Sequence, residues 1–374
     1  MDIAYPISGA TMPPSASTLL ERIAAALPAM RARAEPLDHA ARFAADDVAD
    51  MRALGCLAAP IPVRFGGLGL GTETAGASAT LAMLRLIGAG SLAVGRVIEG
   101  HVNALRLVMR FGAPAQQRQT AADTRDGHLF ALWIAEREPV LLTGAPHAPV
   151  LRGRKSFGSA VGAATRAIVS ATDAAGDAWL VSVAADHPNV ATEALAYPPQ
   201  GMRAAGNGRI TFHDVPGGVL GAPGDYLREP EFSAGAWRAS AVASGGLDAL
   251  IETACAQLRA QGRGTDPHQL ARMGHALIAR ETASLWLHKA APLADGPTDS
   301  PDRQAYINLA RIAVESAGLD ALRLVQRSLG LAAFVPPNPI ERLSRDLATL
   351  LRQPAPDEAL TDGAAYYMQH DLPP

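Results

Sequence analysis

Two stretches of the sequence combine residue types that suit a flat cofactor with polar edges. The first is LFALWIAE, residues 129–136, whose alternating apolar and aromatic residues predict a buried β-strand of ordinary length. The second is LRGRKSFGSA, residues 151–160, which brings a basic residue, an aromatic residue and a Gly-Ser pair together. Backbone N–H groups, a hydroxyl and a flat ring in one place predict a shelf for such a cofactor.

The sequence lacks the motifs expected for metal ligation, nucleophilic catalysis or phosphate binding. The ten histidines are scattered without metal-ligand spacing, and neither a GxSxG nucleophile turn nor a phosphate-binding P-loop occurs. The loop APIPVRFGGLGLGTETA, residues 59–75, is rich in glycine, but Thr72 stands where a dinucleotide-binding loop needs its third glycine. We therefore expect no metal site, and we expect cofactor chemistry in which side chains position and tune a bound group.

The overall composition limits the partners and the compartment. A net charge of −3 over 374 residues gives no reason to expect nucleic acid or an anionic membrane as a partner. No apolar run approaches the ~20 residues of a membrane span, and residues 1–15 lack the features of a secretory signal. Cys56 and Cys255 stand without CxxC or histidine partners, which favours buried, reduced thiols in a cytoplasmic protein.

The periodicity of the chain predicts an α+β fold that is mainly α. We expect an N-terminal helical domain over residues 1–124, a middle β-domain (barrel or sandwich) over 125–230, and a C-terminal four-helix bundle over 231–374. In the first part, helices are expected over 18–27, where Pro28 interrupts the helix, over 43–54, from about 72, and over 92–111. The bundle helices are expected at 234–261, 267–290, 302–330 and 340–351.

The middle part alternates with a period of two. RAIVSAT (166–172) and AWLVSVA (178–184) flank the turn DAAGD and predict a β-hairpin. GRITFHDV (208–215) predicts a further strand.

A single histidine, His101, falls on the apolar face of the helix predicted over 92–111. Such a residue is either a hydrogen-bonded core histidine or one that faces a ligand pocket, and the pattern leaves both interpretations open.

The order and spacing of several motifs resemble the acyl-CoA dehydrogenase superfamily of flavoproteins, over residues 19–363. LGCLAAPIPVRFGGLG (54–69) resembles the family's proline- and glycine-rich loop, and LFALWIAEREP (129–139) resembles its first flavin-contacting strand. GRKSFGSA (153–160) is similar to the family strand G-x-K-x-W-I-T-N. GMRAAGNGRITFHDVPGGVLG (201–221) and PIERLSRD (339–346) are similar to two later family motifs.

The resemblance implies FAD bound between the β-domain and the bundle, usually with a neighbouring subunit of a homotetramer or dimer completing the site. Matched residue by residue, Trp133 and Ile134 should lie by the flavin ring. Phe157 and Ser159 should face it, with the Ser159 hydroxyl near the reactive N5 edge. For the aromatic residues, the alternative is a place in the core of the β-domain.

Two further FAD residues are implied in the bundle. Arg263, or less favourably Arg259, matches the arginine that meets the FAD pyrophosphate, and its alternative is a solvated loop. Gln326 matches the glutamine of the family's Q-x-x-G-G motif, although Leu329 replaces the first glycine.

The family's catalytic base has no counterpart at its usual places. A dehydrogenase of this family needs a carboxylate to remove the α-proton while hydride leaves the β-carbon. The position nine residues after the arginine of the RD pair is Pro354, and the position before Arg238 is Trp237. Asp357 and Glu358 follow shortly after and are the candidate bases; the alternative for both is an exposed polar loop.

A branch of the same superfamily consists of reduced-flavin monooxygenases, which use O₂ and need no α-proton base. They carry a histidine on the helix of His101, a serine at the strand position of Ser159, and a histidine near Gln353. The first two correspond in this sequence, and the third does not.

The resemblance therefore implies an FAD-dependent oxidoreductase that carries out the α,β-dehydrogenation of an acyl thioester. Its substrate would be an acyl-CoA or another small molecule, and its electrons would pass to a separate acceptor flavoprotein. The alternatives are a monooxygenase served by a flavin reductase, with FMN possible in place of FAD, and a silent binding homologue that keeps only the fold.

Overall fold

The structure is a computed structural model that describes residues 15–134, 139–145, 148–196, 198–229, 231–296 and 301–372. Its first part is helical. The helices are α1 (Ala16–His39), α2 (Ala45–Leu54), α3 (Ala77–Gly90), α4 (Leu92–Phe111) and α5 (Pro114–Arg125), with the short 3₁₀ turns η1 (Val63–Phe65) and η2 (Thr74–Gly76) before α3. The apolar faces of α1, α3 and α4 meet in one hydrophobic core.

The described strands of the middle part form one seven-stranded sheet that closes on itself. They are β1 (Phe130–Trp133), β2 (Leu141–Ala145), β3 (Ala148–Gly158), β4 (Arg166–Thr172), β5 (Ala178–Ala184), β6 (Val190–Ala194) and β7 (Gly208–Leu220). The path β4-β2-β3-β7-β5 returns to β4 because β5 also pairs with β4, while β1 and β6 pair with β4 and β7. The closed path makes the sheet a small barrel.

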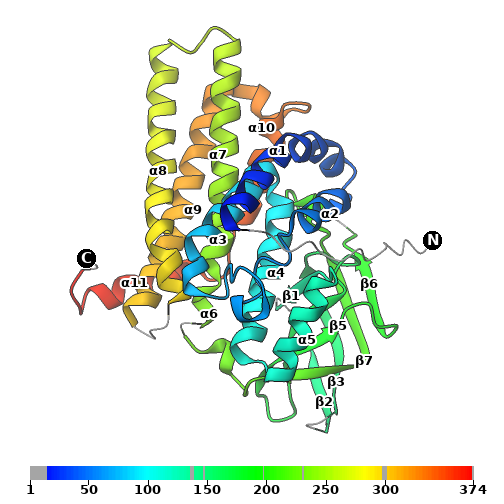
Figure 1. The fold of residues 1–374 in the computed structure, drawn as a ribbon. Helices are drawn as coiled ribbons and strands as arrows, with labels where there is room; N and C mark the ends of the chain where they lie inside the picture. Colours follow the sequence, from blue (N-terminus) through cyan, green and yellow to red (C-terminus); the bar gives the residue numbers. More distant parts are fainter. Residues whose placement is uncertain are drawn as a thin grey trace.

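The last part is helical again. α6 (Glu231–Ala234) leads into α7 (Ala236–Ala260), and α8 (Pro267–Asp295), α9 (Pro301–Leu329), α10 (Pro339–Leu351) and α11 (Pro356–Tyr367) follow. Figure 1 shows α7, α8 and α9 running side by side, with the turn between α7 and α8 at the end of the bundle far from the barrel. α10 packs against α7 and α9, and α11 packs against α9.

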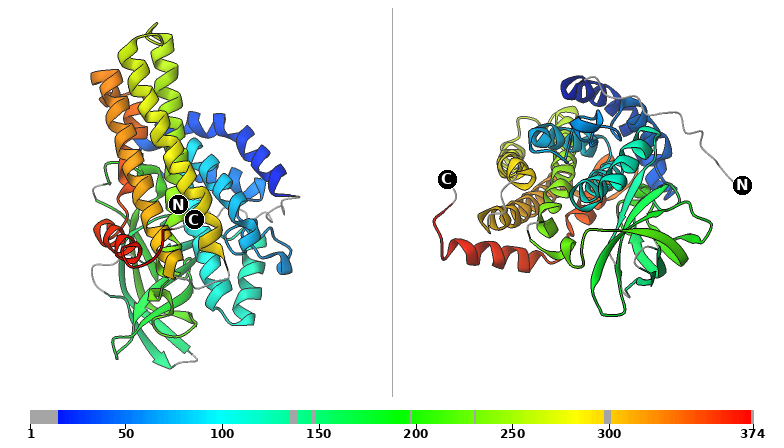
Figure 2. Two further views of the ribbon diagram at one scale, coloured as in Figure 1. Left: turned by 90° about the vertical axis from the view of Figure 1, so that its left-hand side faces the viewer. Right: turned by 60° about the horizontal axis from the view of Figure 1, so that its bottom comes forward.

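One helix connects the two ends of this arrangement. α4 packs against β1 on one side and against α7 on the other. The left view in Figure 2 shows the barrel at one end of the molecule, with the long bundle helices projecting away from it. The region where α4, α7 and the barrel meet is therefore the place where residues of all three parts can form one site.

The predicted fold class is confirmed: an α+β fold, mainly α, with helices, a β-barrel and helices in that order. The helix over 92–111 and the hairpin strands over 166–172 and 178–184 have the predicted bounds. The strand predicted over 129–136 is present as β1, and residues 135 and 136 lie outside the described residues. The domain boundaries at 124 and 230 stay predictions.

One helix prediction is wrong. α1 does not stop at Pro28 but continues to His39. Ile23 and Met30, on either side of the proline, are fully buried in the shared core. Their packing outweighs the one backbone hydrogen bond that proline cannot make.

The patterns also miss two helices, α5 and α11. α5 is largely polar, and α11 buries only Ala359 and Gly363. Neither helix therefore shows a strong apolar repeat. A hydrophobic period is the main sequence signal for a helix, and here it is too weak to read.

Two glycines allow α3 and α7 to approach closely. A Cβ atom at Gly88 would lie 2.2 Å from the carbonyl oxygen of Val242, and one at Gly245 would lie 1.9 Å from the carbonyl oxygen of Arg85. These contacts involve backbone atoms on both sides, so a side chain could be accommodated only by moving a helix. The α3–α7 spacing therefore depends on glycine at both positions.

We predict that Gly245→Ala lowers the free energy of unfolding by about 1–3 kcal/mol, because the added methyl group forces α3 and α7 apart. Urea denaturation followed by circular dichroism measures this change. Gly100→Ala in α4 is the matched control, since a Cβ atom there meets nothing within 4 Å. We expect this control to be neutral or stabilising by up to about 1 kcal/mol; equal losses in both variants would contradict the close-approach argument.

Candidate functional site

A bulge near the end of β3 turns one aromatic side chain outward. The pairing of β3 with β7 shifts register between Lys155 and Gly158. Within this bulge, Phe157 has a φ of 63°, in the left-handed region that bulky residues rarely adopt, and its side chain is 56% exposed. Strained backbone of this kind clusters at functional sites, where the surrounding structure imposes it. The bulge thus displays a flat ring on the barrel surface.

Ser159 follows the bulge and is held from inside the barrel. Its carbonyl oxygen accepts a hydrogen bond of 3.0 Å from Nε1 of Trp133. Its side chain is half-buried, and the hydroxyl has no hydrogen-bond partner among the described residues. A polar group is therefore available beside the exposed ring of Phe157.

The strand β1 turns Trp133 into the barrel and turns Leu132 and Ile134 the other way, where both pack against the apolar cluster between the barrel and α4. Trp133 is buried and packs against Phe212, with ring centroids 6.4 Å apart. Leu132 and Ile134 are half-buried. This placement favours the alternative for Trp133, a place in the core of the β-domain; its role beside a flavin stays a prediction. Successive side chains of a strand point to opposite faces, so an inward Trp133 places its two neighbours outward.

A buried lysine fixes the end of β1. Nζ of Lys155 donates to Oγ of Ser170 at 2.7 Å and to the carbonyl oxygen of Ile134 at 3.3 Å, and the Ser170 hydroxyl donates to the same carbonyl at 3.1 Å. A buried ammonium group is tolerated only when it is hydrogen-bonded. Lys155 thereby holds Ile134 in place. The presence of a lysine in the family strand motif does not by itself reveal this role.

These residues fit the flavin that the resemblance implies. A flavin has a flat, largely apolar ring system with polar atoms along its edges. Phe157 and Ile134 offer apolar contact to a ring face, and Ser159 offers a hydroxyl to an edge. The outward face formed by β1 and the β3 bulge is therefore the candidate flavin surface.

The other two predicted FAD residues lie elsewhere. Arg263 is half-buried in the turn between α7 and α8, and its Nη1 donates to the carbonyl oxygen of Ser328 at 3.2 Å. Gln326 is half-buried on α9, two residues before Ser328, so both residues gather at one end of the bundle. Figure 1 places that end away from the barrel. Within one chain, Arg263 and Gln326 therefore do not meet the candidate flavin surface.

His101 is buried, and both of its ring nitrogens are already hydrogen-bonded. Nδ1 accepts from the backbone N–H of Phe130 at 3.0 Å, and Nε2 donates to the carbonyl oxygen of Leu57 at 2.9 Å. Burial lowers the pKa of His101 to about 4, so the imidazole is neutral at pH 7. This arrangement favours the core interpretation, in which His101 ties α4 to β1 and to the loop after α2.

The predicted catalytic carboxylates are on the surface. Asp357 and Glu358 are exposed in the first turn of α11, where acidic residues are favourable beside a helix N-terminus. Pro354 is exposed in the loop before them, and Trp237 is buried near the start of α7. This placement favours the interpretation of Asp357 and Glu358 as exposed polar residues, although they lie on a helix and not in a loop; their catalytic role stays a proposal.

A small cavity lies near both family base positions. Its volume of about 10 Å³ leaves room for about one water molecule. Ser240, three residues after Trp237, lines it from α7, and Gln353 lines it from the end of α10. The carboxylate in its lining is Glu315 on α9, which is ion-paired with Arg352. Nothing in the sequence around Glu315 marks it, because only the fold brings α9 to this place.

Arg238, next to Trp237, is the centre of a buried polar network. Its Nη2 forms an ion pair with Asp295 at the end of α8 and donates to the carbonyl oxygen of Gly71 at 3.2 Å. Its Nη1 donates to Oδ1 of Asn103 on α4 at 3.0 Å. Burial lowers the pKa of Arg238 to about 10, which leaves it charged at neutral pH. The guanidinium carbon lies 5.1 Å from the ring centroid of Trp237, at cation–π distance.

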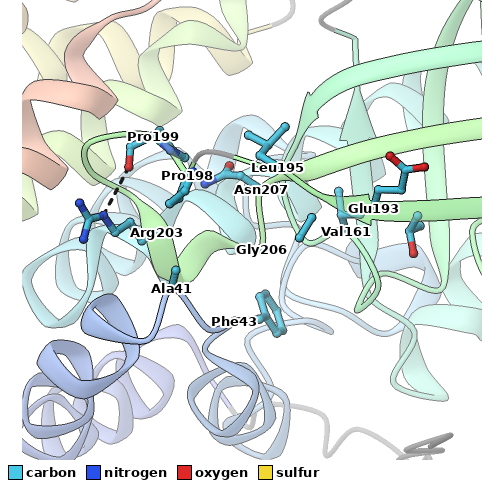
Figure 3. A pocket seen from close by; sticks show the side chains of 12 residues that line it. Ala41, Phe43, Val161, Glu193, Leu195, Pro198, Pro199, Arg203, Gly206 and Asn207 are labelled. Carbon is cyan, nitrogen blue, oxygen red and sulfur yellow. Dashed lines mark hydrogen bonds between the residues drawn. The ribbon is translucent and has the colours of Figure 1, made fainter.

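A separate hollow of about 280 Å³, shown in Figure 3, lies between the linker after α1 and the barrel. Phe43 lines it from the helical side, and Leu195 and Arg203 line it from the barrel side. Nε of Arg203 donates to the carbonyl oxygen of Pro199 at 3.4 Å. No residue of the candidate flavin surface belongs to its lining, so we do not include this hollow in the site.

The part of the chain that the structure describes contains no group of three or more His, Cys, Asp or Glu side chains placed to hold a metal ion. None of the described helices is both long and apolar enough to cross a membrane. Cys56 and Cys255 are free thiols, and burial raises the pKa of Cys56 to about 12.

Comparison with known sequences finds one family. Residues 20–128 match the family model described as the N-terminal domain of acyl-CoA dehydrogenase. The curated protein sequences contain no match to this chain.

Comparison with solved structures finds the same fold in several flavoproteins. KijD3, solved in complex with FMN and dTDP-3-amino-2,3,6-trideoxy-4-keto-3-methyl-D-glucose, has 21% identity, a TM-score of 0.80 and 97% coverage of both chains. Butyryl-CoA dehydrogenase from Megasphaera elsdenii has 16% identity and a TM-score of 0.79, covering 99% of this chain and 100% of that chain. TdsC from Paenibacillus sp. A11-2, solved with FMN and indole, has 19% identity and a TM-score of 0.80, covering 95% and 98%.

The buried His101 makes stability depend on pH. The unfolded histidine, with a pKa of 6.5, binds a proton between about pH 4 and 6.5, whereas the folded one does not, so the free energy of unfolding rises with pH in this window. We predict that, because of His101, acidification from pH 7 to 4 lowers the free energy of unfolding by roughly 3 kcal/mol. This value follows from about 1.4 kcal/mol per pKa unit. Urea denaturation at several pH values should show a shallower pH dependence for His101→Gln.

His268→Gln provides the control for that measurement, because His268 is exposed in the first turn of α8. Its pH profile should match that of the unmodified protein. If His101→Gln kept the full pH dependence, the neutral core histidine would be the wrong description.

Proposed function

We propose that this chain, which belongs to the acyl-CoA dehydrogenase superfamily, is a flavin-dependent oxidoreductase. The strained and exposed Phe157, the available hydroxyl of Ser159 and the outward Ile134 support a flavin on the barrel surface. When bound, a flavin supplies the redox chemistry, since it takes up hydride and, in its reduced form, reacts with O₂. The chain itself then has to hold, orient and shield the reacting groups.

Of the two reactions of the superfamily, monooxygenation with externally supplied reduced flavin has the better support. One observation carries this assignment: both base positions hold residues that cannot take up a proton, namely Trp237 and Pro354. The FMN complexes of KijD3 and TdsC support a use of this fold with substrates other than acyl thioesters. A flavin reductase would be the partner, and FMN as well as FAD would suit the surface.

The residues around the reaction centre have distinct tasks in this proposal. Phe157 and Ile134 bind a face of the ring, and Ser159 donates a hydrogen bond to its edge. Trp237 fills the place of the base and excludes water from it. Its buried indole N–H has no hydrogen-bond partner among the described residues, so it is available to a polar atom of a ligand.

The α,β-dehydrogenation of an acyl thioester by FAD, with an electron-acceptor flavoprotein as partner, is the second candidate. It is supported by the fold shared with butyryl-CoA dehydrogenase. Its base would be Asp357, Glu358 or Glu315. The first two are exposed and Glu315 is paired with Arg352, so each would have to move or lose its ion pair to act. For this reason dehydrogenation ranks second.

A homo-oligomer, a dimer or tetramer, is part of the proposal. Arg263 and Gln326 belong to the end of the bundle at the α7–α8 turn, which Figure 1 shows away from the barrel, so a second copy would have to supply them to the flavin surface. α8 also exposes an apolar stripe at a helical spacing, made of Leu270, Leu277, Ile278 and Leu285. An exposed apolar stripe of this kind is typical of a subunit contact.

Two mixing experiments distinguish the candidate reactions. We expect acyl-CoAs, added without oxygen to the flavin-loaded protein, to leave its visible flavin absorption unchanged. We expect the protein loaded with reduced FMN to give, on mixing with O₂, a transient absorption that belongs to neither reduced nor oxidised flavin. Ser159→Ala should shorten the lifetime of that transient about two- to tenfold, the equivalent of one lost hydrogen bond.

Ser182→Ala is the matched control, a half-buried strand serine on β5 outside the site, and should leave the lifetime unchanged. Bleaching by an acyl-CoA would overturn the monooxygenase assignment and support dehydrogenation, and Glu315→Gln, Asp357→Asn and Glu358→Gln would then identify the base. Protein that takes up neither FMN nor FAD would overturn both reactions and indicate a binding homologue.

The oligomer is tested with a charge placed in the α8 stripe. We predict that Ile278→Glu weakens self-association by about tenfold or more, because the carboxylate would be buried without a partner. Sedimentation velocity over a range of protein concentrations measures the shift. Val63→Glu is the control, since Val63 on η1 is equally exposed but lies outside the stripe. A monomeric unmodified protein, or an unchanged mass for Ile278→Glu, would refute the proposal.

A further inference from the structure

The strand β6 has an open edge beside the hollow of Figure 3. Among the described strands, β6 pairs with β7 alone, so its other edge carries backbone groups that no neighbouring strand uses. Natural sheets usually block such an edge with a proline, a lysine or a bulge. Residues 190–194, VATEA, contain neither proline nor lysine, and their pairing with β7 has no register shift. This edge can therefore accept a further strand.

Two residues point their backbone groups toward the open edge. The carbonyl oxygen of Asn189 accepts from the N–H of His213 in β7 at 3.0 Å. Backbone groups of successive residues point alternately to the two sides of an antiparallel strand, so residues 189, 191 and 193 bond to β7. Thr192 and Ala194 then point their N–H and C=O groups the other way, and neither has another backbone partner among the described residues. Both residues are exposed and line the hollow, so unused donors and acceptors border it.

Apolar side chains line the hollow next to this edge. Its volume is about 280 Å³, and its apolar lining includes Phe43, Val161, Leu195, Pro198 and Pro199. Phe43 comes from the linker between α1 and α2, and the other four come from the barrel part of the chain. Alternate side chains of a strand point to the same face. A strand added to β6 can therefore place an apolar side chain in the hollow.

The hollow also contains one arginine without an ion-pair partner. Arg203 is half-buried; its Nε donates to the carbonyl oxygen of Pro199 at 3.4 Å, and its other two nitrogens have no partner among the described residues. Figure 3 shows Glu193 on the opposite side of the hollow. Glu193 is 67% exposed and lies 4.0 Å from Arg209, and exposed pairs of this kind contribute little. The Arg203 end therefore favours an acidic ligand group.

We propose that the open edge of β6 and the hollow beside it bind an extended segment of a partner protein that carries an apolar and an acidic side chain. The segment would pair with Thr192 and Ala194 as an added strand and place its carboxylate at Arg203. In this mode of recognition, backbone pairing supplies affinity and side-chain pockets supply specificity. A guanidinium group and a carboxylate form paired hydrogen bonds, which fixes the position of the segment along the edge.

Fluorescence anisotropy of labelled synthetic peptides, mixed with the full chain, tests this surface. The probes are two heptapeptides of threonine that carry leucine and aspartate two positions apart, in either order, so that both side chains point to one face. We expect one of them to bind with one site per chain. Lysine in place of its aspartate should raise the Kd about tenfold, the effect of one lost charge-assisted hydrogen bond.

Methylation of the peptide's backbone nitrogens distinguishes strand addition from simple apolar contact. The methylated peptide keeps its side chains but cannot donate to the edge of β6, so we expect no measurable binding. This comparison needs no change in the protein. If the methylated peptide bound as tightly as its parent, or if neither aspartate peptide bound, the proposal would be overturned.

Substitutions at Arg203 test the charge. Arg203→Gln should remove the preference for aspartate over lysine, and Arg203→Glu should reverse it by about tenfold. Arg154→Gln is the matched control, since Arg154 is an exposed strand arginine on β3 outside the hollow, and should leave both Kd values unchanged. A retained preference for aspartate in Arg203→Glu would contradict the assigned role of Arg203.

Thr192→Pro tests the open edge from the side of the protein. Proline removes an N–H that points away from β7, so the bonds to β7 stay intact and the peptide should bind at least tenfold more weakly. Circular dichroism checks that the variant is folded. An unchanged Kd in the folded variant would count against strand addition.

Two other occupants would show themselves in the same experiments. If N-acetylaspartate amide bound as tightly as the peptide, the hollow would be a site for small carboxylates, and strand addition would be wrong. If the unmodified protein bound no peptide and Thr192→Pro lowered its mass in sedimentation velocity, a second copy would cover the edge, which also overturns the proposal. Flavin uptake enters none of these measurements, so their failure leaves the proposed function untouched.

Discussion

The buried ion pair between Arg238 and Asp295 is the interaction on which the site depends. Both side chains have 0% exposure. Desolvating two charges costs several kcal/mol per ion and is offset only when the remaining hydrogen-bonding capacity is filled. Asn103 and the carbonyl of Gly71 accept from Arg238, and Arg106 contributes to Asp295, so the cost is offset in part; Nε of Arg238 and Oδ2 of Asp295 have no hydrogen-bond partner among the described residues. One pair thereby joins the start of α7, the end of α8, the middle of α4 and the loop before η2.

That junction also explains two local features. Gly71 has a φ of 83°, and a Cβ atom there would lie 2.4 Å from Cγ1 of Val102, so only glycine lets its carbonyl reach Arg238. Trp237 is fixed by its neighbour Arg238 and is itself buried. The family base position on α7 is therefore filled by a rigid indole. A base for dehydrogenation would have to come from another element, such as α9 or α11.

Local patterns were enough to predict α4 and the β4–β5 hairpin, because their periodicity and turn lie within one short stretch. The path of α1 through Pro28 could not be predicted, since it depends on packing against α3. The inward side of Trp133 depends on the strand register, which a few residues do not determine. Sequence patterns could not predict the Arg238 network at all. Its members are spread between residues 71 and 295 and come together only in the folded chain.

The α4 face toward α6 and α7 bears on the choice of reaction. Arg96, Glu99, Asn103, Arg106 and Arg110 recur at helical spacing on one side of α4. Glu99 pairs with Arg96 and accepts from Asn103, and Arg106 and Arg110 face Glu231. An apolar acyl chain placed along this face would strip water and partners from charged groups and gain little in return. A polar substrate would instead extend the same network. The charged face of α4 therefore supports the proposed monooxygenase over fatty acyl dehydrogenation, independently of the base positions that Trp237 and Pro354 occupy.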